Sequence, residues 1–151
     1  MLIRFVWVGR TRDEAAAGWI EEYRRRIGRF CPVQIEEIRD ASGKGRDRAA
    51  RESHELASRL GGRALIVTLD ERGTEMTSVE FARFLEKSLG AHPEVTFVLG
   101  GAEGLGEELV SSAGARLCLS RLTFTHEMAR VLLLEQVYRA FTILKGTPYH
   151  R

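Results

Sequence analysis

The chain has 151 residues, a length that suits one compact domain covering residues 1–151. Its residues are 44% hydrophobic and 29% charged, a composition that excludes a largely disordered or collagen-like chain. The formal net charge is only +2 at pH 7, so charge alone does not indicate a strongly basic nucleic-acid-binding protein.

The first half of the chain alternates strand and helix patterns. A branched and aromatic run predicts a strand over Leu2–Val8. Apolar residues that recur every four positions predict a helix over Asp13–Arg29, and a second strand is predicted over Val33–Ile38. The glycine-rich, charged segment Asp40–Arg48 predicts a mobile surface loop, followed by a helix that ends near Leu60.

The second half continues this alternation. The predicted strand Arg63–Leu69 is apolar at its centre, as a buried parallel strand would be. Thr77 and Glu80 have the spacing of a capping box, which predicts a helix to about Leu89. The remaining predicted elements are the strand Val95–Leu99, the helix Glu107–Ala113, the strand Arg116–Leu119 and the helix His126–Lys145. The alternation predicts a single α/β domain with a mostly parallel sheet and flanking helices.

The two cysteines and the hydropathy pattern bear on location and metals. Cys31 and Cys118 are far apart and lack the spacing of metal ligands, so no metal site is expected. No segment resembles a secretory signal, and no apolar run approaches the roughly 18 residues of a membrane span. We therefore expect a cytoplasmic protein with free thiols and no membrane partner.

The last predicted helix is unusually apolar. Val131–Leu134 is apolar over a full turn, and the apolar residues after it extend beyond one stripe. A helix on the outside of a monomer keeps a polar face, so this helix must be buried on more than one side. Either the protein's own fold or a partner subunit can provide that cover.

Four glycines follow the predicted strand Val95–Leu99 within the segment Gly100–Gly106. Because glycine allows positive φ and close backbone approach, the segment is either a ligand-binding loop or a plain strand-to-helix turn. It lacks both the Gly-Lys-Ser/Thr of a Walker loop and the spacing of the dinucleotide fingerprint. Phosphate binding is therefore disfavoured, whereas a neutral or cationic ligand stays possible.

Two groups of polar residues near the end of the chain are candidates for catalysis or binding. His126 and Arg130 are four residues apart at the start of the last predicted helix, so they share a face. Tyr149, His150 and Arg151 end the sequence. These side chains can move protons, bind phosphate or stack on a base. The plain alternatives are a capping histidine and a frayed tail.

Five segments match one known pattern when they are taken together. They are Phe97–Leu105, Leu119–His126, Arg130–Val131, Glu135–Ala140 and Pro148–Arg151. Jointly they resemble the RlmH family of the SPOUT superfamily, whose members are ribosomal large-subunit RNA pseudouridine N3-methyltransferases. The resemblance covers essentially the whole chain. It departs at Ala102, where the family often has Pro or Ser, and at Thr125, where Pro is usual.

The resemblance implies an α/β fold with a C-terminal trefoil knot, a homodimer, and S-adenosylmethionine bound in the knot. The implied cofactor-binding residues are Leu69, Gly100, Gly101, Gly104, Leu119, Ser120, Arg121, Leu122, Thr123 and Phe124. Backbone groups would bind the adenine, and apolar side chains would sandwich it. The implied catalytic and RNA-side residues are His126, Arg130, Tyr149, His150 and Arg151.

The implied reaction is methyl transfer to N3 of a pseudouridine in the helix 69 region of 23S ribosomal RNA. N3 carries a proton, so His150 or His126 would act as the base. Arg130 or Arg151 would stabilise the developing negative charge, and Tyr149 would stack on the target base. No metal is needed.

The low net charge favours an assembled large subunit or 70S ribosome as the partner, because a domain with few cations binds free RNA weakly. Two alternative functions remain open. One is a related methyltransferase that acts on another RNA, such as transfer RNA. The other is a non-enzymatic ribosome-binding factor.

Overall fold

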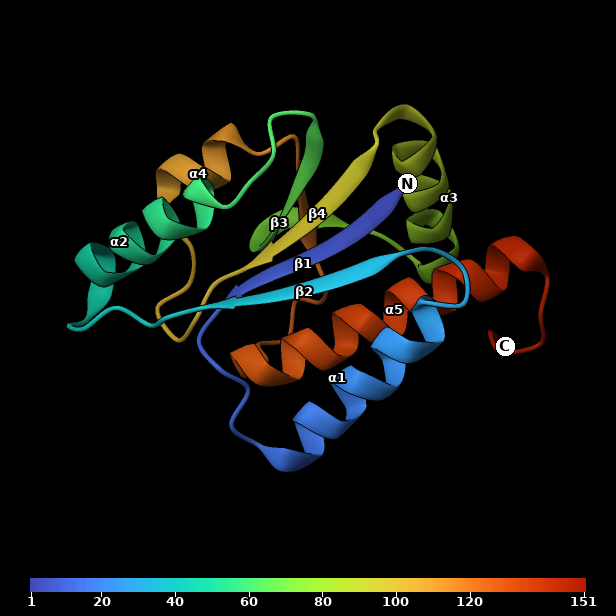
Figure 1. Cartoon of the computed structure of the whole chain (residues 1–151), viewed down its shortest axis with the longest axis horizontal. Coiled ribbons are helices and arrows are strands. Elements are labelled where there is room, and N and C mark those ends of the chain that lie inside the picture. The colour runs from blue at the N-terminus through green and yellow to red at the C-terminus, as the bar shows by residue number, and fades with distance from the viewer.

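Five parallel strands form one sheet in the order β2-β1-β4-β3-β5 in the computed structural model, which describes residues 1–151 (Figure 1). The strands are β1 (Leu2–Val8), β2 (Val33–Ile38), β3 (Ala64–Glu75), β4 (Glu94–Leu99) and β5 (Ala115–Cys118). The predicted α/β class with a parallel sheet is confirmed.

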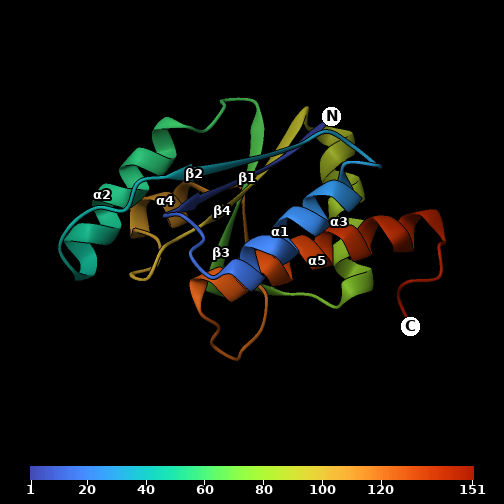
Figure 2. The same cartoon turned by 60° about the horizontal axis from the view of Figure 1, so that its bottom comes forward.

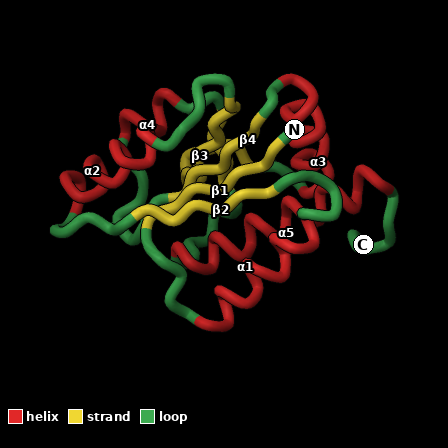
Figure 3. Tube along the Cα trace, in the orientation of Figure 1, coloured by secondary structure: helices red, strands yellow, loops and turns green.

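Helices cover both faces of the sheet. The helices are α1 (Glu14–Ile27), α2 (Gly45–Ser58), α3 (Ser78–Ala91), α4 (Glu107–Ser112) and α5 (His126–Lys145). Helices α1, α3 and α5 lie on one face, and α2 with the short α4 lies on the other (Figure 2). The strands therefore form a middle layer between two helical layers (Figure 3). None of these helices combines the length and the hydropathy needed to cross a membrane.

Alternating side chains of the strands build two cores. Phe5, Trp7 and Phe97 belong to the larger cluster of 22 buried residues, which is shared with α1, α3 and α5. Val8 and Val98 belong to a cluster of six buried residues beneath α2 and α4. Because helices cover both faces, the central strands are apolar on both sides, as the strand pattern predicted.

Side-chain caps fix the starts of three helices. Asp13 accepts a hydrogen bond from the Ala16 backbone N–H at the start of α1. The capping box predicted from Thr77 and Glu80 is present at the start of α3. Thr125 accepts from the Met128 N–H at 3.2 Å, so the residue that replaces the more usual proline caps α5.

Two predicted boundaries were wrong. Helix α2 begins at Gly45, within the segment Asp40–Arg48 that was predicted as a loop, because the turn is completed at the positive-φ residues Gly43 and Gly45. Strand β3 continues beyond Leu69 to Glu75. The charged residues of this extension do not show the apolar pattern of a strand. In the structure the register shifts between Leu69 and Thr74, and the segment between them bulges out of the ladder.

Helix α5 is covered by its own fold on more than one side. It packs against both α1 and α3 and against the sheet. Leu133, Leu134, Val137 and Ala140 have no exposed surface. Intramolecular packing thus accounts for most of the apolar surface that the sequence pattern identified.

Both cysteines are free and buried. Burial raises the pKa of the Cys31 thiol to about 11. The reactive thiolate is therefore scarce at neutral pH. We expect neither cysteine to be alkylated by iodoacetamide in native protein at pH 8, whereas both react after unfolding in urea. Intact-protein mass spectrometry measures this, and rapid labelling of the native protein would contradict the packing around Cys31.

Candidate functional site

The carboxyl ends of β3, β4 and β5 lie at one edge of the sheet. Thr68 is opposite Val98 in the β3–β4 ladder, and Leu69 is opposite Leu117 in the β3–β5 ladder. Leu69 therefore lies between the glycine segment that follows β4 and the loop that follows β5. The arrowheads in Figure 1 point to the same side of the molecule as the start of α5. Ligands of parallel α/β sheets bind at such an edge.

The glycine segment forms a tight turn. A Cβ added at Gly100 would lie 2.5 Å from the carbonyl carbon of Gly104, so only glycine fits at position 100. The Gly104 N–H donates to the Gly101 carbonyl at 3.0 Å, and Gly104 has φ of 74°. The Gly106 N–H donates to Ser53 Oγ at 2.6 Å, which ties the turn to α2. Packing alone thus requires Gly100.

An apolar cavity of about 250 Å³ opens beside the loop that follows β5. Leu119 and Phe124, both predicted cofactor-binding residues, line this cavity. The other lining residues are Met76, Ser78, Phe81, Leu117, Cys118, Leu132 and Gln136. Seven of the nine lining residues are hydrophobic, and Ser78 and Gln136 supply polar groups at the wall. This composition suits a flat, mostly apolar ring with a few polar atoms.

The central residues of the loop between Leu119 and Phe124 are exposed to solvent. Leu122 is 74% exposed, and the Arg121 side chain is 87% exposed. Ser120 holds the loop, because its hydroxyl accepts from the Leu122 N–H at 3.0 Å and its carbonyl accepts from the Cys118 thiol. Arg121 and Leu122, like the exposed Thr123, can therefore serve a ligand in this cavity with backbone groups rather than with buried side chains.

A second hollow of about 510 Å³ lies beside the first. Its lining includes Ala102, Phe124, Thr125, His126 and Met128. Phe124 thus separates the apolar cavity from a hollow that contains an imidazole and part of the glycine segment. His126 and the predicted cofactor residue Phe124 line this hollow together. No group of three or more His, Cys, Asp or Glu side chains is arranged to hold a metal ion.

The C-terminal tail lies at the opposite end of α5. The Tyr149 hydroxyl donates to Glu135 at 3.0 Å and lies 3.4 Å from the Tyr23 hydroxyl. The Arg139 guanidinium covers the Tyr149 ring, and its Nη1 lies 3.3 Å from Nδ1 of His150. Burial and these hydrogen bonds raise the pKa of Tyr149, so its hydroxyl stays protonated at neutral pH. Arg151 is exposed.

The structure does not bring the tail to the cavities of its own protomer. The tail folds back along α5, but only to Glu135, which lies nine residues after His126, or roughly 13 Å at 1.5 Å per residue. His126 begins this helix, whereas Tyr149–Arg151 follow its end (Figure 1). Of the predicted catalytic residues, only His126 lines a hollow beside the cofactor residues.

Arg130 differs from the other predicted RNA-side residues because it has no exposed surface. Its Nη1 donates to Thr11 Oγ1 at 2.9 Å, its Nη2 donates to the Val8 carbonyl, and its guanidinium lies over the Trp7 ring at 4.9 Å. Burial lowers the pKa of Arg130, while Glu37, 4.0 Å away, favours the charged form. Arg130 can therefore influence a substrate only through the segment it holds, after β1.

Sequence reasoning missed the partners of Arg130. Glu37 accepts hydrogen bonds from Trp7 Nε1 and from the Thr11 N–H, both at 3.0 Å. The sequence also gave no sign of the burial of Asp70, one of whose carboxylate oxygens has no partner at the bulge of β3. No spacing rule connects residues on separate strands and helices, so only the fold shows these contacts.

Replacing Arg130 should destabilise the protein. Arg130→Ala removes two hydrogen bonds to the segment after β1 and leaves a cavity over Trp7, so we expect a loss of about 3 kcal/mol in the free energy of unfolding. Urea denaturation monitored by circular dichroism measures it. Arg25→Ala, which removes an exposed cation, serves as the control and should change stability by less than about 1 kcal/mol. Equal effects of the two substitutions would contradict the structural role of Arg130.

Comparison with known proteins identifies the family. The family described as "Predicted SPOUT methyltransferase" matches residues 1–150. The chain belongs to the SPOUT methyltransferase family. Curated relatives named ribosomal RNA large subunit methyltransferase H include those of Geotalea daltonii, 44% identical, and Geobacter metallireducens, 45% identical. Each alignment covers 99% of both chains. A relative of that name from Anaeromyxobacter sp. is 40% identical over the full length of both chains.

A solved structure supports the fold of this SPOUT methyltransferase. A probable methylase family protein from Haemophilus influenzae Rd KW20 aligns with a TM-score of 0.57 at 15% identity. The alignment covers 99% of this chain and 70% of that one. The resemblance to the RlmH family noted in the sequence is confirmed by the full-length relatives.

Proposed function

We propose that this chain transfers the methyl group of S-adenosylmethionine to N3 of a pseudouridine in 23S ribosomal RNA, in the helix 69 region of an assembled large subunit or 70S ribosome. The observation that carries the proposal is the apolar cavity at the carboxyl edge of the sheet, which Leu119 and Phe124 line. The names of the full-length relatives support a large-subunit RNA as the substrate.

The residues at this edge fit the cofactor. The walls formed by Leu119 and Phe124 suit an adenine ring, and the backbone of Ser120–Thr123 provides polar groups beside it. Leu69, Gly100, Gly101 and Gly104 lie on the neighbouring strand ends, where they would border the rest of the molecule. When bound, S-adenosylmethionine supplies an electrophilic methyl group, so no metal is required for the transfer.

The absence of tail residues from both hollows supports a homodimer. Because none of Tyr149, His150 and Arg151 lines either hollow, and Tyr149 is held against Glu135, a second copy would have to bring its tail to this site. We further propose that the segment after β4 forms the trefoil knot of the family and that the protein acts in the cytoplasm, where ribosomes are assembled.

Proton removal from N3 falls to a histidine in this proposal. His126 is close to the cofactor residues, and His150 would arrive with the tail of the second copy. Tyr149 stays protonated, so it would stack on the base or donate a hydrogen bond rather than accept the proton. Arg151 would stabilise negative charge on the base. Arg130, being buried, acts indirectly.

Mass spectrometry of ribosomal RNA tests the function and the role of the tail. Large subunits from a strain that lacks this protein should gain one methyl group on a pseudouridine when incubated with the protein and S-adenosylmethionine. A variant without residues 149–151 should bind the cofactor normally but transfer methyl at least about 100-fold more slowly, because positioned groups contribute this much. Full activity of that variant would refute the role of the tail.

The same assay separates the alternative functions. Methylation of transfer RNA but not of large subunits would favour a methyltransferase with another substrate. Absence of S-adenosylmethionine binding in calorimetry, with ribosome binding intact, would favour a non-enzymatic factor.

A substitution in the cavity tests where the cofactor binds. Phe124→Ala removes one wall, so we expect S-adenosylmethionine affinity to fall roughly 10-fold while the melting temperature changes little. Val79→Ala is the control, because Val79 is an exposed apolar residue of α3 that does not line the cavity. Isothermal titration calorimetry measures both. Unchanged affinity in Phe124→Ala would show that the cofactor does not bind in this cavity.

A further inference from the structure

The segments that follow β1 and β2 lie side by side. Val8 is opposite Ile38 in the ladder, and the Gly9 N–H donates to the Ile38 carbonyl at 2.7 Å. The two segments that continue from here, Gly9–Asp13 and Arg39–Arg48, are called the basic edge below. Together they carry six cationic side chains and three carboxylates, an excess of three positive charges. The whole chain has a net charge of only +2, so the residues outside these two segments sum to −1, and two of their carboxylates, Glu37 and Glu127, contact the first segment.

Five cations of the basic edge are available to a partner. They are exposed and form no ion pair or side-chain hydrogen bond within the protein, and they are Arg10, Arg12, Arg39, Lys44 and Arg46. The sixth, Arg48, lies 3.5 Å from Asp40 and 3.4 Å from Glu52. Of the three carboxylates, Asp13 caps α1, Asp40 lies beside Arg48 and only Asp47 has no local partner.

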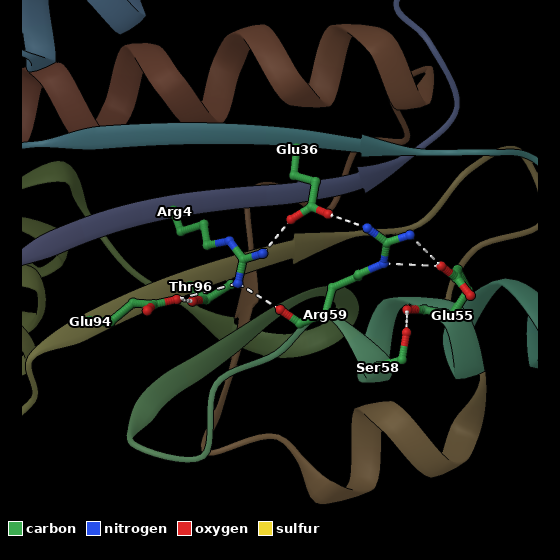
Figure 4. A network of polar contacts seen from close by, with 7 residues as sticks. All are labelled: Arg4, Glu36, Glu55, Ser58, Arg59, Glu94 and Thr96. Atoms are coloured by element: carbon green, nitrogen blue, oxygen red, sulfur yellow. Dashed lines mark hydrogen bonds and ion pairs between the residues drawn. The ribbon is translucent and has the colours of Figure 1, made fainter.

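Two arginines near the start of β1 are neutralised within the protein. Arg4 of β1 and Arg59, just after α2, both pair with Glu36, and Arg59 also pairs with Glu55 at 2.8 Å (Figure 4). Arg4 additionally donates to the Arg59 carbonyl. Arg4 and Arg59 thus have carboxylate partners, whereas five of the six cations of the basic edge have none.

The first segment of the basic edge is held rigidly. Glu37 accepts from the Thr11 N–H at 3.0 Å, and Arg130 donates to the Thr11 hydroxyl at 2.9 Å. Glu127 of α5 accepts from the N–H groups of Arg12 and Asp13 at 2.9 and 3.0 Å. Because the backbone on both sides of Arg10 and Arg12 is fixed, their guanidinium groups need little further ordering of the main chain to bind a ligand.

The basic edge adjoins the candidate site. Strand β1 pairs with β4, with Trp7 opposite Leu99, so the segment after β1 is next to the glycine segment. A Cβ added at Gly101 would lie 3.2 Å from the Val8 side chain. Asp13 lines the same hollow as Ala102 and His126. A polyanion bound across Arg10 and Arg12 therefore passes beside the hollow that contains His126.

We propose that the basic edge binds phosphate groups of the ribosomal RNA that flank the target nucleotide, with Arg130, Glu37 and Glu127 as positioning residues for Arg10 and Arg12. The proposal rests on the proposed function for the identity of the RNA. Arginine forks and a lysine on two neighbouring segments match a phosphate backbone, whose binding is dominated by charge. This surface also explains how a chain with net charge +2 can bind RNA at all.

The test compares two variants that remove the same charges. The first combines Arg10→Ala, Arg12→Ala, Arg39→Ala and Lys44→Ala. The control combines Arg29→Ala, Arg63→Ala, Arg83→Ala and Lys87→Ala, which are also exposed and form no ion pair but lie outside the basic edge. Co-sedimentation with purified large ribosomal subunits over a series of salt concentrations gives the affinity and its salt dependence. Calorimetry with S-adenosylmethionine and thermal unfolding are measured in parallel.

We expect the basic-edge variant to bind large subunits roughly 100-fold more weakly at low salt, and the slope of log affinity against log salt to fall by about 3, from four lost phosphate contacts. The control should match the unchanged protein, and both variants should keep their cofactor affinity and melting temperature. Equal binding by the two variants would overturn the proposal. Lost binding with an unchanged salt slope would also overturn it, because it would indicate a protein surface as the partner.

Failure of the proposed function would look different. The unchanged protein would then transfer no methyl group to the same subunits, whatever the binding series shows.

Discussion

Parallel pairing of all five strands sends every carboxyl end to one edge of the sheet, and the candidate site depends on that constraint. The glycine segment after β4, the loop after β5 and the bulge of β3 lie next to one another only because these strands are neighbours in the order β4-β3-β5. The basic edge lies on the other side of β4 for the same reason, since β1 and β2 complete the sheet there. One edge therefore combines an apolar cavity, an imidazole and a cationic surface.

Helix α5 connects these features physically. Its first turns provide Glu127 and Arg130, which hold the segment after β1, and its cap Thr125 follows the loop that lines the cavity. Arg130 is a charge with no exposed surface, held by a carbonyl, a hydroxyl, an aromatic face and the nearby Glu37. Such a buried charge is costly unless its groups are paired, and of the three guanidinium nitrogens of Arg130 only Nε has no partner. Its contacts couple the position of the first basic segment to the packing of the core.

The far end of α5 has a different character. There the aromatic rings of Tyr23, Tyr138 and Tyr149 pack together with Arg26 and Arg139, and the tail folds back onto this cluster. The tail is thus ordered by contacts within its own protomer, although none of its residues lines the cavity. This separation is the structural reason to consider a second copy of the chain as part of the site.

The sequence determined the class of the fold and most element boundaries, because hydrophobic periodicity, the Thr77–Glu80 capping box and glycine placement are local signals. It also identified the Leu119–His126 segment, through a joint pattern that matches full-length relatives. The strand extension to Glu75 could not be predicted, since a register shift depends on the partner strand β5. The burial of Arg130, the hydrogen bonds of Glu37 and the packing of Tyr149 against Glu135 could not be predicted either. Those features depend on which elements become neighbours in space. Arg130 and Thr11 are more than a hundred positions apart, and such a contact leaves no pattern in the local sequence spacing.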